Sequence, residues 1–178
     1  MRKIAASLFV SLDGVAEDPD TWHFPYFNDE MGEAVGAAMA ASDAMLLGRV
    51  QYQQSAAYWP SSDDEFADFM NGQKKYVVTT TLTEATWNNT EIISGDIPAG
   101  IRALKASEGK DIAVTGSLTL VRSLLKAQLL DRLQLFVHPI IVGKGARWFD
   151  GLDTIKLRLD TSETFTTGVN NQIYAPTG

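Results

Sequence analysis

The fold is decided by two stretches, Leu46-Leu47-Gly48-Arg49 and Ile112-Ala113-Val114-Thr115-Gly116-Ser117-Leu118-Thr119-Leu120, in which an apolar run ends in a glycine turn before a predicted helix. Glycine at such a turn lets backbone amides approach a phosphate, and the helix N-terminus adds partial positive charge. Two such turns from strands of one sheet could hold a dinucleotide at both ends. The pattern therefore predicts a dinucleotide site at one edge of an α/β sheet.

Composition limits the class of protein. The 178 residues, 45% of them hydrophobic, are enough for one domain over residues 1–178. A net charge of -7 disfavours binding to nucleic acid or an anionic membrane. The chain has no cysteine, so it has no disulfide and no thiolate ligand, and we expect no metal site. Residues 1–10 resemble a short signal peptide but run into Ser11 without a cleavage site, so we interpret them as a strand and expect a cytoplasmic protein.

The order of predicted elements indicates βα units first and antiparallel strands last. Strands are predicted at 3–11, 44–47, 76–78, 91–93 and 111–114, and helices at 28–41, after Gly48, at 97–107 and from Leu118. Alternating apolar residues predict three further strands, within 133–137, 155–159 and 168–175. The segment 18–27 is rich in proline and aromatic residues, which predicts a long loop that covers part of the protein.

The helix predicted over 28–41 has two different faces. Asn28 suits the N-cap, and Met31, Val35 and Met39 fall on one stripe. The other face consists almost entirely of alanine and glycine. Small side chains permit close approach, so we expect this helix to be buried against the sheet.

Five short motifs, in this order, carry a resemblance to a known family. They are Ser11-Leu12-Asp13-Gly14, Leu47-Gly48-Arg49, Thr79-Thr80-Thr81, Thr115-Gly116-Ser117 and His138-Pro139-Ile140-Ile141-Val142-Gly143. Over nearly its whole length the chain resembles the dihydrofolate reductase-like superfamily. More closely, it resembles stand-alone bacterial relatives of the C-terminal reductase domain of the riboflavin-biosynthesis deaminase-reductase. The resemblance implies a three-layer α/β fold with a mixed, mostly parallel sheet of about eight strands, antiparallel at its C-terminal end and flanked by helices.

The resemblance also implies that NADPH lies across the carboxyl edge of the sheet. The residues that would bind it are Ala5, Ala6, Gly48, Arg49, Gln51, Thr79, Thr80, Thr81, Thr115, Gly116, Ser117, Leu118 and Thr119. Arg49 would lie near the adenosine 2′-phosphate, which suits a guanidinium fork. Two alternatives stay open: Arg49 is a solvated residue of an ordinary turn, and the threonine hydroxyls only satisfy strand ends.

Three positions depart from the family pattern. Gln51 stands where many relatives have threonine, Thr115 where the riboflavin-pathway reductases have glutamate, and Ser7 near their substrate-facing lysine. A ribosylaminopyrimidine would lose a carboxylate and a cation that hold its polar groups. Riboflavin synthesis is therefore not the expected activity.

The substrate pocket and the proton donor are harder to assign. Trp22, Phe27, Tyr58 and Trp59 are predicted to form an aromatic wall for a flat heterocycle. The pattern does not identify a catalytic group, and Asp13, His23 and Glu33 are the candidates. Each has a structural alternative: Asp13 holding a loop, Glu33 decorating the first turn of its helix, and His23 having no catalytic role.

Taken together, the sequence predicts an NADPH-dependent reductase that transfers hydride to a small planar heterocycle, such as a pteridine, a pyrimidine or a flavin-like compound. The alternative is a non-catalytic dinucleotide- or ligand-binding protein that kept the fold. A hydrolase using Ser11 or Ser117 with His23 or His138 is disfavoured, because neither serine lies in a nucleophile elbow. His138 is expected to be structural, and Lys144 and Arg147 either contact a substrate anion or solvate a loop. We expect a homodimer formed through the late strands, with an apolar edge around Leu133 to Val137.

Overall fold

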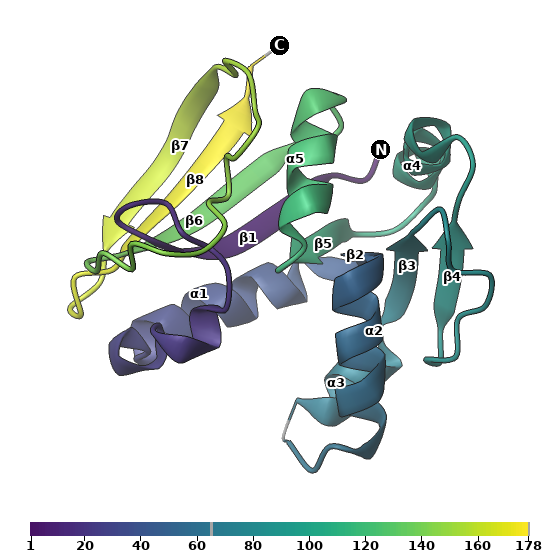
Figure 1. Cartoon of the computed structure of the whole chain (residues 1–178), viewed down its shortest axis with the longest axis horizontal. Coiled ribbons are helices and arrows are strands. Elements are labelled where there is room, and N and C mark those ends of the chain that lie inside the picture. The colour runs from purple at the N-terminus through teal and green to yellow at the C-terminus, as the bar shows by residue number, and fades with distance from the viewer. Residues whose placement is uncertain (65, 178) are drawn as a thin grey trace.

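Eight strands form one sheet in the order β4-β3-β2-β5-β1-β6-β8-β7 (Figure 1). The strands are β1 Ile4–Ser11, β2 Ser42–Gly48, β3 Lys74–Val78, β4 Thr90–Ile93, β5 Asp111–Thr115, β6 Arg132–His138, β7 Leu157–Thr164 and β8 Asn170–Pro176. The computed structural model describes residues 1–64 and 66–177. Strands β1 to β6 pair in parallel, whereas β8 is antiparallel to both β6 and β7. The predicted mixed sheet with antiparallel C-terminal strands is confirmed.

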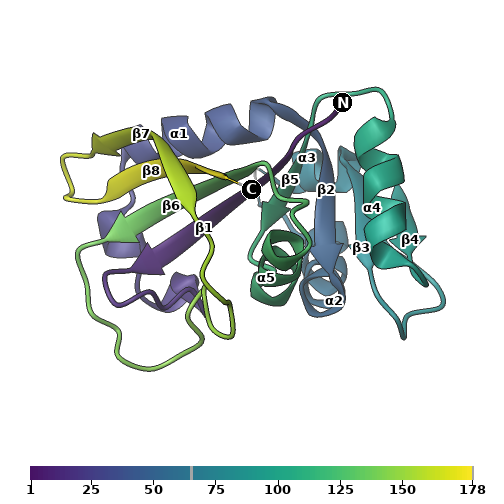
Figure 2. The same cartoon turned by 90° about the horizontal axis from the view of Figure 1, so that it is seen from above.

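Helices cover both faces of the sheet. They are α1 Asp29–Ala40, α2 Arg49–Tyr58, α3 Ala67–Gly72, α4 Ile97–Ala106 and α5 Leu118–Lys126. Figure 2 shows α1 on one side of the sheet and α4 and α5 on the other. The short helix α3 was not predicted from the sequence. In the part of the chain that the structure describes, none of the helices combines the length and apolar character needed to cross a membrane.

The alternation of side chains along β1 explains the three layers. Ile4, Ala6, Leu8 and Val10 point to the α4 and α5 face and are almost completely buried in the main core. The intervening residues of β1 point to the α1 face, where Phe9 packs beside Met31 and Phe136. Successive strand residues face opposite sides of a sheet, so one strand supplies both cores.

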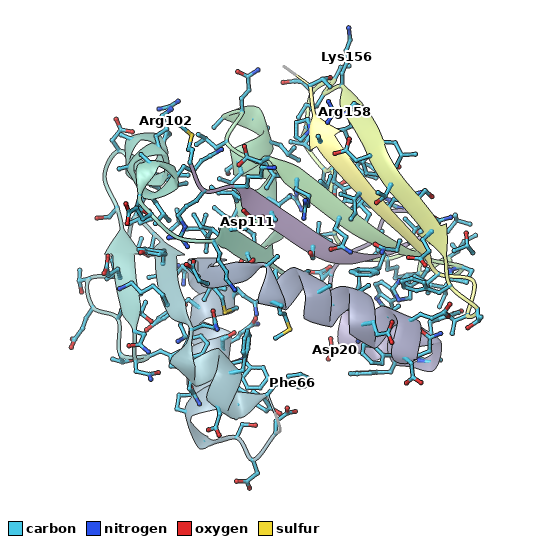
Figure 3. All side chains as sticks on the ribbon, turned by 180° about the vertical axis from the view of Figure 1, so that it is seen from behind. Asp20, Phe66, Arg102, Asp111, Lys156 and Arg158 are labelled. Carbon is cyan, nitrogen blue, oxygen red and sulfur yellow. The ribbon has the colours of Figure 1, made fainter. Side chains whose placement is uncertain are left out.

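Helix α1 is less buried than the sequence suggests. Asn28 caps it as predicted, its side-chain oxygen accepting a hydrogen bond from the amide of Met31 at 3.0 Å. Met31 is completely buried, but Gly36 and Ala37 face solvent. The small residues therefore do not draw the helix into the core. The helix crosses one face of the sheet, as Figure 3 shows from behind.

The position of β6 corrects the expected dimer contact. β6 lies between β1 and β8, and Leu133 and Leu135 are buried in the main core. An interior strand has no free edge, so the run from Leu133 to Val137 cannot offer one. The edge strands are β4 and β7. The homodimer itself stays a prediction.

Two histidines lie buried on the α1 face. The Nδ1 atom of His138 is 2.8 Å from the carbonyl oxygen of Phe136 and 3.2 Å from that of Val10, so it carries a proton and donates. Among the described residues, its Nε2 atom has no hydrogen-bond partner, and neither has Nδ1 of His23, which stacks on Phe9 with ring centroids 4.5 Å apart. Burial lowers the pKa of both imidazoles. The structural role expected for His138 agrees with this packing.

Lys75 is a completely buried cation at the start of β3. Its Nζ donates to the carbonyl oxygens of Asn71, Gln73 and Asn88 at 3.1, 2.7 and 3.1 Å, and lies 4.2 Å from the ring centroid of Trp87. Burial lowers its pKa to about 8, so the amine is still mostly protonated at neutral pH. This single group ties the end of α3 to the loop before β4.

Replacing Lys75 with methionine should lower the free energy of unfolding by about 3 kcal/mol, because three buried carbonyl oxygens lose their donor while the volume is kept. Urea denaturation measures the loss. Lys74→Met is the matched control, since Lys74 is partly exposed and pairs with Glu91 on the surface; it should change the value by less than about 1 kcal/mol. Equal effects of the two substitutions would contradict the role of Lys75.

The histidines should make the protein sensitive to mild acid. Because their folded-state pKa values lie below the ordinary 6.5, the unfolded chain binds more protons, and stability falls as pH drops below that value. Asp20 partly opposes the shift of His23. The chain has 2 histidines, so NMR titration of the ring protons reads both pKa values. Values at or above 6.5 would contradict the prediction, and His23→Phe should reduce the acid sensitivity.

Candidate functional site

A cavity of about 1230 Å³ opens at the carboxyl ends of β2 and β5, continues between α1 and the sheet, and extends on the other side along α4 and α5. Gly48, Gly116 and Ser117 line its mouth, and Val35 and Met39 of α1 line its inner part. Residues 16–20 of the loop after β1 form another wall, so the loop predicted to cover part of the protein does so here. The crevice beyond the carboxyl ends of parallel strands is where α/β sheets bind ligands.

The two glycine turns meet at the mouth of this cavity. The Ser117 hydroxyl accepts a hydrogen bond from the amide of Gly48 at 3.0 Å, which joins the end of β2 to the turn after β5. Gly48 is the N-cap of α2 and Ser117 that of α5, and in the part of the chain that the structure describes neither residue caps its helix through a side chain. The amide of Leu118 donates to the carbonyl oxygen of Gly116 at 3.1 Å, and the other first-turn amides are suited to an anionic ligand.

Position 116 requires a glycine, both because of its backbone conformation and because of the side chain that lies beside it. Its φ of +68° lies in the left-handed region, and a Cβ atom there would lie 2.8 Å from Oε1 of Gln51. Gln51 thus lies against the turn, in the position where the sequence comparison with the family puts threonine. Both residues line the cavity.

Several other predicted cofactor residues also line the cavity: Ala5, Arg49, Thr115, Leu118 and Thr119. Arg49 is exposed, and its Nη1 donates to Oε1 of Gln53 at 2.8 Å. Ala6 differs from Ala5, because its side chain is completely buried in the core on the opposite face.

The threonine run does not line the cavity among the residues described. The Thr79 hydroxyl oxygen accepts hydrogen bonds from the amides of Thr81 and Leu82 at 3.1 and 3.0 Å. That oxygen therefore closes the turn after β3, as the alternative interpretation supposed, while Thr80 and Thr81 are exposed. A phosphate role for Thr79 is not supported by this arrangement.

The predicted aromatic wall does not form. Trp22 is buried and meets the edge of His138 with ring centroids 5.2 Å apart, whereas Phe27 and Tyr58 are exposed. Trp59 packs beside a separate cluster with Met45 and Leu47. Helix α2 has 10 residues and extends about 15 Å from Gly48, which carries its C-terminal aromatic residues away from the mouth of the cavity.

The three candidate catalytic residues also lie outside the cavity lining of the described chain. Asp13 accepts hydrogen bonds from the Ser11 hydroxyl at 2.6 Å and from the amides of Val142 and Gly143 at 3.1 and 2.9 Å. These donors lower its pKa to about 2. The ionised carboxylate therefore joins the loop after β1 to the loop after β6. His23 is buried behind Phe9, and Glu33 is exposed on α1.

The same contacts remove the hydrolase alternative. The Ser11 hydroxyl is bonded to Asp13 and the Ser117 hydroxyl to Gly48, and in the described chain neither is bonded to a histidine. Arg147 donates its Nε proton to the carbonyl oxygen of Asp13 at 2.9 Å, so it supports the loop.

Gln134 is a cavity residue that the sequence did not identify. It lies in the middle of β6, is 6% exposed and lines the cavity. Ser7 donates to its Oε1 at 3.0 Å, and its Nε2 donates to Oδ1 of Asn171 at 2.9 Å. Strand alternation predicts that Gln134 and Leu135 face opposite sides, but only the register shows which side holds the cavity.

Comparisons with known proteins agree with this architecture. The chain is 28% identical to the uncharacterised protein YyaP of Bacillus subtilis (strain 168), over 97% of this chain and 94% of that one. Its fold is similar to a candidate riboflavin biosynthesis protein from Shewanella sp. PV-4, with a TM-score of 0.80, 20% identity and full coverage of both chains. It is also similar to dihydrofolate reductase from Enterococcus faecalis in complex with NADP(H), with a TM-score of 0.66, 12% identity, and coverage of 99% and 97%.

The fold is thus dihydrofolate reductase-like. The model of the family described as RibD C-terminal domain matches residues 2–170, which includes all of the cavity. The chain belongs to the RibD C-terminal domain family and has a reductase-like architecture.

Proposed function

We propose that this protein is an NADPH-dependent reductase that transfers hydride to a small planar heterocycle in the cytoplasm. The observation that carries the proposal is the meeting of two uncapped helix N-termini at the mouth of one cavity, joined by Ser117 and Gly48. Two such N-termini suit a ligand that carries more than one phosphate. Membership of the RibD C-terminal domain family supports the reductase class.

The residues at the mouth fit the proposed cofactor. Gly116 has no side chain at the turn, which leaves the backbone open to a phosphate, and the amides of Ser117 and Thr119 at the start of α5 are the proposed donors. Arg49, at the first position of α2, supplies a guanidinium for a further phosphate. The bound nicotinamide would supply the hydride. In the similar fold of Enterococcus faecalis dihydrofolate reductase, NADP(H) is the bound dinucleotide.

The inner part of the cavity fits a flat ring. Ala5 and Ala113 are paired on adjacent strands and give a floor of small side chains, with Val35 and Met39 of α1 opposite. Direct hydride transfer requires chiefly that the two rings be held face to face and that water be limited. Asp13, His23 and Glu33 lie outside the cavity lining, so none of these three is the proton donor in this proposal.

That same observation favours one second candidate, a protein that binds a dinucleotide without turnover. It predicts cofactor binding and no oxidation of NADPH across a panel of pteridines, pyrimidines, flavins and quinones. Oxidation of NADPH with any of these compounds, followed by the loss of absorbance, rejects it and supports the reductase.

Arg49→Ala should weaken NADPH binding by about tenfold and leave NADH binding unchanged, because only NADPH carries the 2′-phosphate that the guanidinium would contact. Energy transfer from tryptophan to the reduced nicotinamide measures both affinities. Arg102→Ala is the control, since Arg102 is an exposed cation of α4 outside the cavity lining (Figure 3). No binding of either dinucleotide to the unaltered protein would overturn the proposal.

Gly116→Ala should weaken binding of NADPH and NADH alike, by about tenfold or more, since the new Cβ strains the backbone and displaces Gln51 from the turn. Gly36→Ala is the matched control: Gly36 is exposed on α1, and a Cβ there meets no atom within 4 Å. It should not change affinity and should slightly raise the melting temperature. If folded Gly116→Ala binds both dinucleotides with unchanged affinity, the proposed phosphate-binding role of this turn is contradicted.

A further inference from the structure

Gln134 lies in a row of polar side chains on the floor of the inner cavity. The strand register pairs Thr115 of β5 with Ser7 of β1, and Ser7 with Gln134 of β6. All three residues line the cavity. Gln134 is the most enclosed of the three, with 6% of its surface exposed. A buried amide on a cavity wall is costly unless its polar atoms have partners.

The amide of Gln134 is held in one orientation from both sides. Its oxygen accepts from the Ser7 hydroxyl at 3.0 Å, and its nitrogen donates to the side-chain oxygen of Asn171 at 2.9 Å. An amide has two N–H groups and two carbonyl lone pairs, so one donor and one acceptor stay free for a ligand. Because the orientation is fixed, a ligand gains both hydrogen bonds without paying to order the side chain.

One of the two rows beside this amide is apolar, and the other carries a cation. The next row of the floor, on the side of the strand ends, holds Phe9 and Phe136, and Val35 and Met39 lie on the α1 side. Arg132 lies two residues before Gln134 on the same face of β6 and also lines the cavity, whereas Asp111, marked in Figure 3, lies at the start of β5. Hydrogen bonds are stronger, and unpaired charges more costly, beside the apolar row.

We infer that Gln134 determines substrate specificity: its locked amide selects a planar ring with adjacent neutral N–H and C=O groups over a ring that binds as a cation. The inference rests on the proposed function, because it takes the inner cavity as the substrate chamber. A lactam or imide edge pairs with one amide donor and one amide acceptor. A protonated amidine finds one acceptor in this row and the positive charge of Arg132 in the next row, so its own charge has no counter-ion there.

The test is ligand binding measured by isothermal titration calorimetry at near-neutral pH, with no dinucleotide present. The probes are pteridine-2,4-dione, its 1,3-dimethyl derivative, which lacks the imide N–H groups, and 2,4-diaminopteridine. The unaltered protein should bind the dione at least about tenfold more tightly than either of the other two. Gln134→Glu should reverse the preference: binding of the dione should weaken, and binding of the diamine should strengthen, by about tenfold each. The reason is that a carboxylate accepts hydrogen bonds from an amidinium and repels a carbonyl oxygen.

Gln172→Glu is the matched control. Gln172 lies on β8, paired with Leu135, so its side chain belongs to the opposite face of the sheet and lies outside the cavity lining. It introduces the same charge and should keep the preference for the dione. Ser7→Ala is a second variant: it removes one of the two hydrogen bonds that hold the amide and should reduce the preference several-fold without reversing it.

Reversal in Gln134→Glu alone supports the inference. The same ligand preference in the unaltered protein and in folded Gln134→Glu overturns it, and so does a lack of binding of all three probes to the unaltered protein. The reductase proposal fails separately, through loss of NADPH binding at the mouth of the cavity. If the protein binds NADPH but its preference among the three probes does not depend on Gln134, the proposed function stands and only this inference is rejected.

Discussion

The hydrogen bond between the Gly48 amide and the Ser117 hydroxyl, 3.0 Å long, is the contact on which the site depends. It joins two turns that are 69 residues apart in the chain and fixes how α2 and α5 leave the sheet. This hydroxyl accepts from the neighbouring turn and does not cap its own helix. The contact that assembles the cavity mouth therefore also leaves two helix N-termini free, and the geometry and the electrostatics of the mouth have one origin.

The inner cavity depends on a different constraint, the small side chains between α1 and the floor. Ala5 and Ala113 on the floor and Ala38 on α1 leave volume that larger residues would fill, although β1 and β5 themselves pair in regular register. Met31 and Phe136 fill the space near the start of α1 and fix the helix there. One end of α1 is therefore anchored in a core while the rest covers a chamber, which explains why its outer residues are exposed.

The sequence predicted features that depend on local pattern and missed those that depend on direction in space. Strand alternation, the Asn28 cap and the glycine turns are local, and the structure has them. Tyr58 and Trp59 follow Gly48 closely in the chain, but the helix between them points away from the cavity. The hydroxyl of Thr79 could serve a ligand or its own turn, and only the structure shows that it closes the turn. Gln134 was missed because a glutamine in an alternating strand carries no signal until the register is known.

Register also changes how the departures from the family pattern are understood. In the sequence, Ser7 and Thr115 stand where the family pattern has charged residues, at two positions more than 100 residues apart. In the sheet they are direct neighbours, and Gln134 completes the same row. A lone carboxylate or ammonium in this row would lie beside uncharged partners and would need a counter-ion to offset its desolvation. The row is therefore uncharged as a unit, and a substrate that fits it must also be satisfied by neutral hydrogen bonds. A single charged residue placed in this row is satisfied only by a ligand of opposite charge, so a charge in the row and the charge of the ligand must change together.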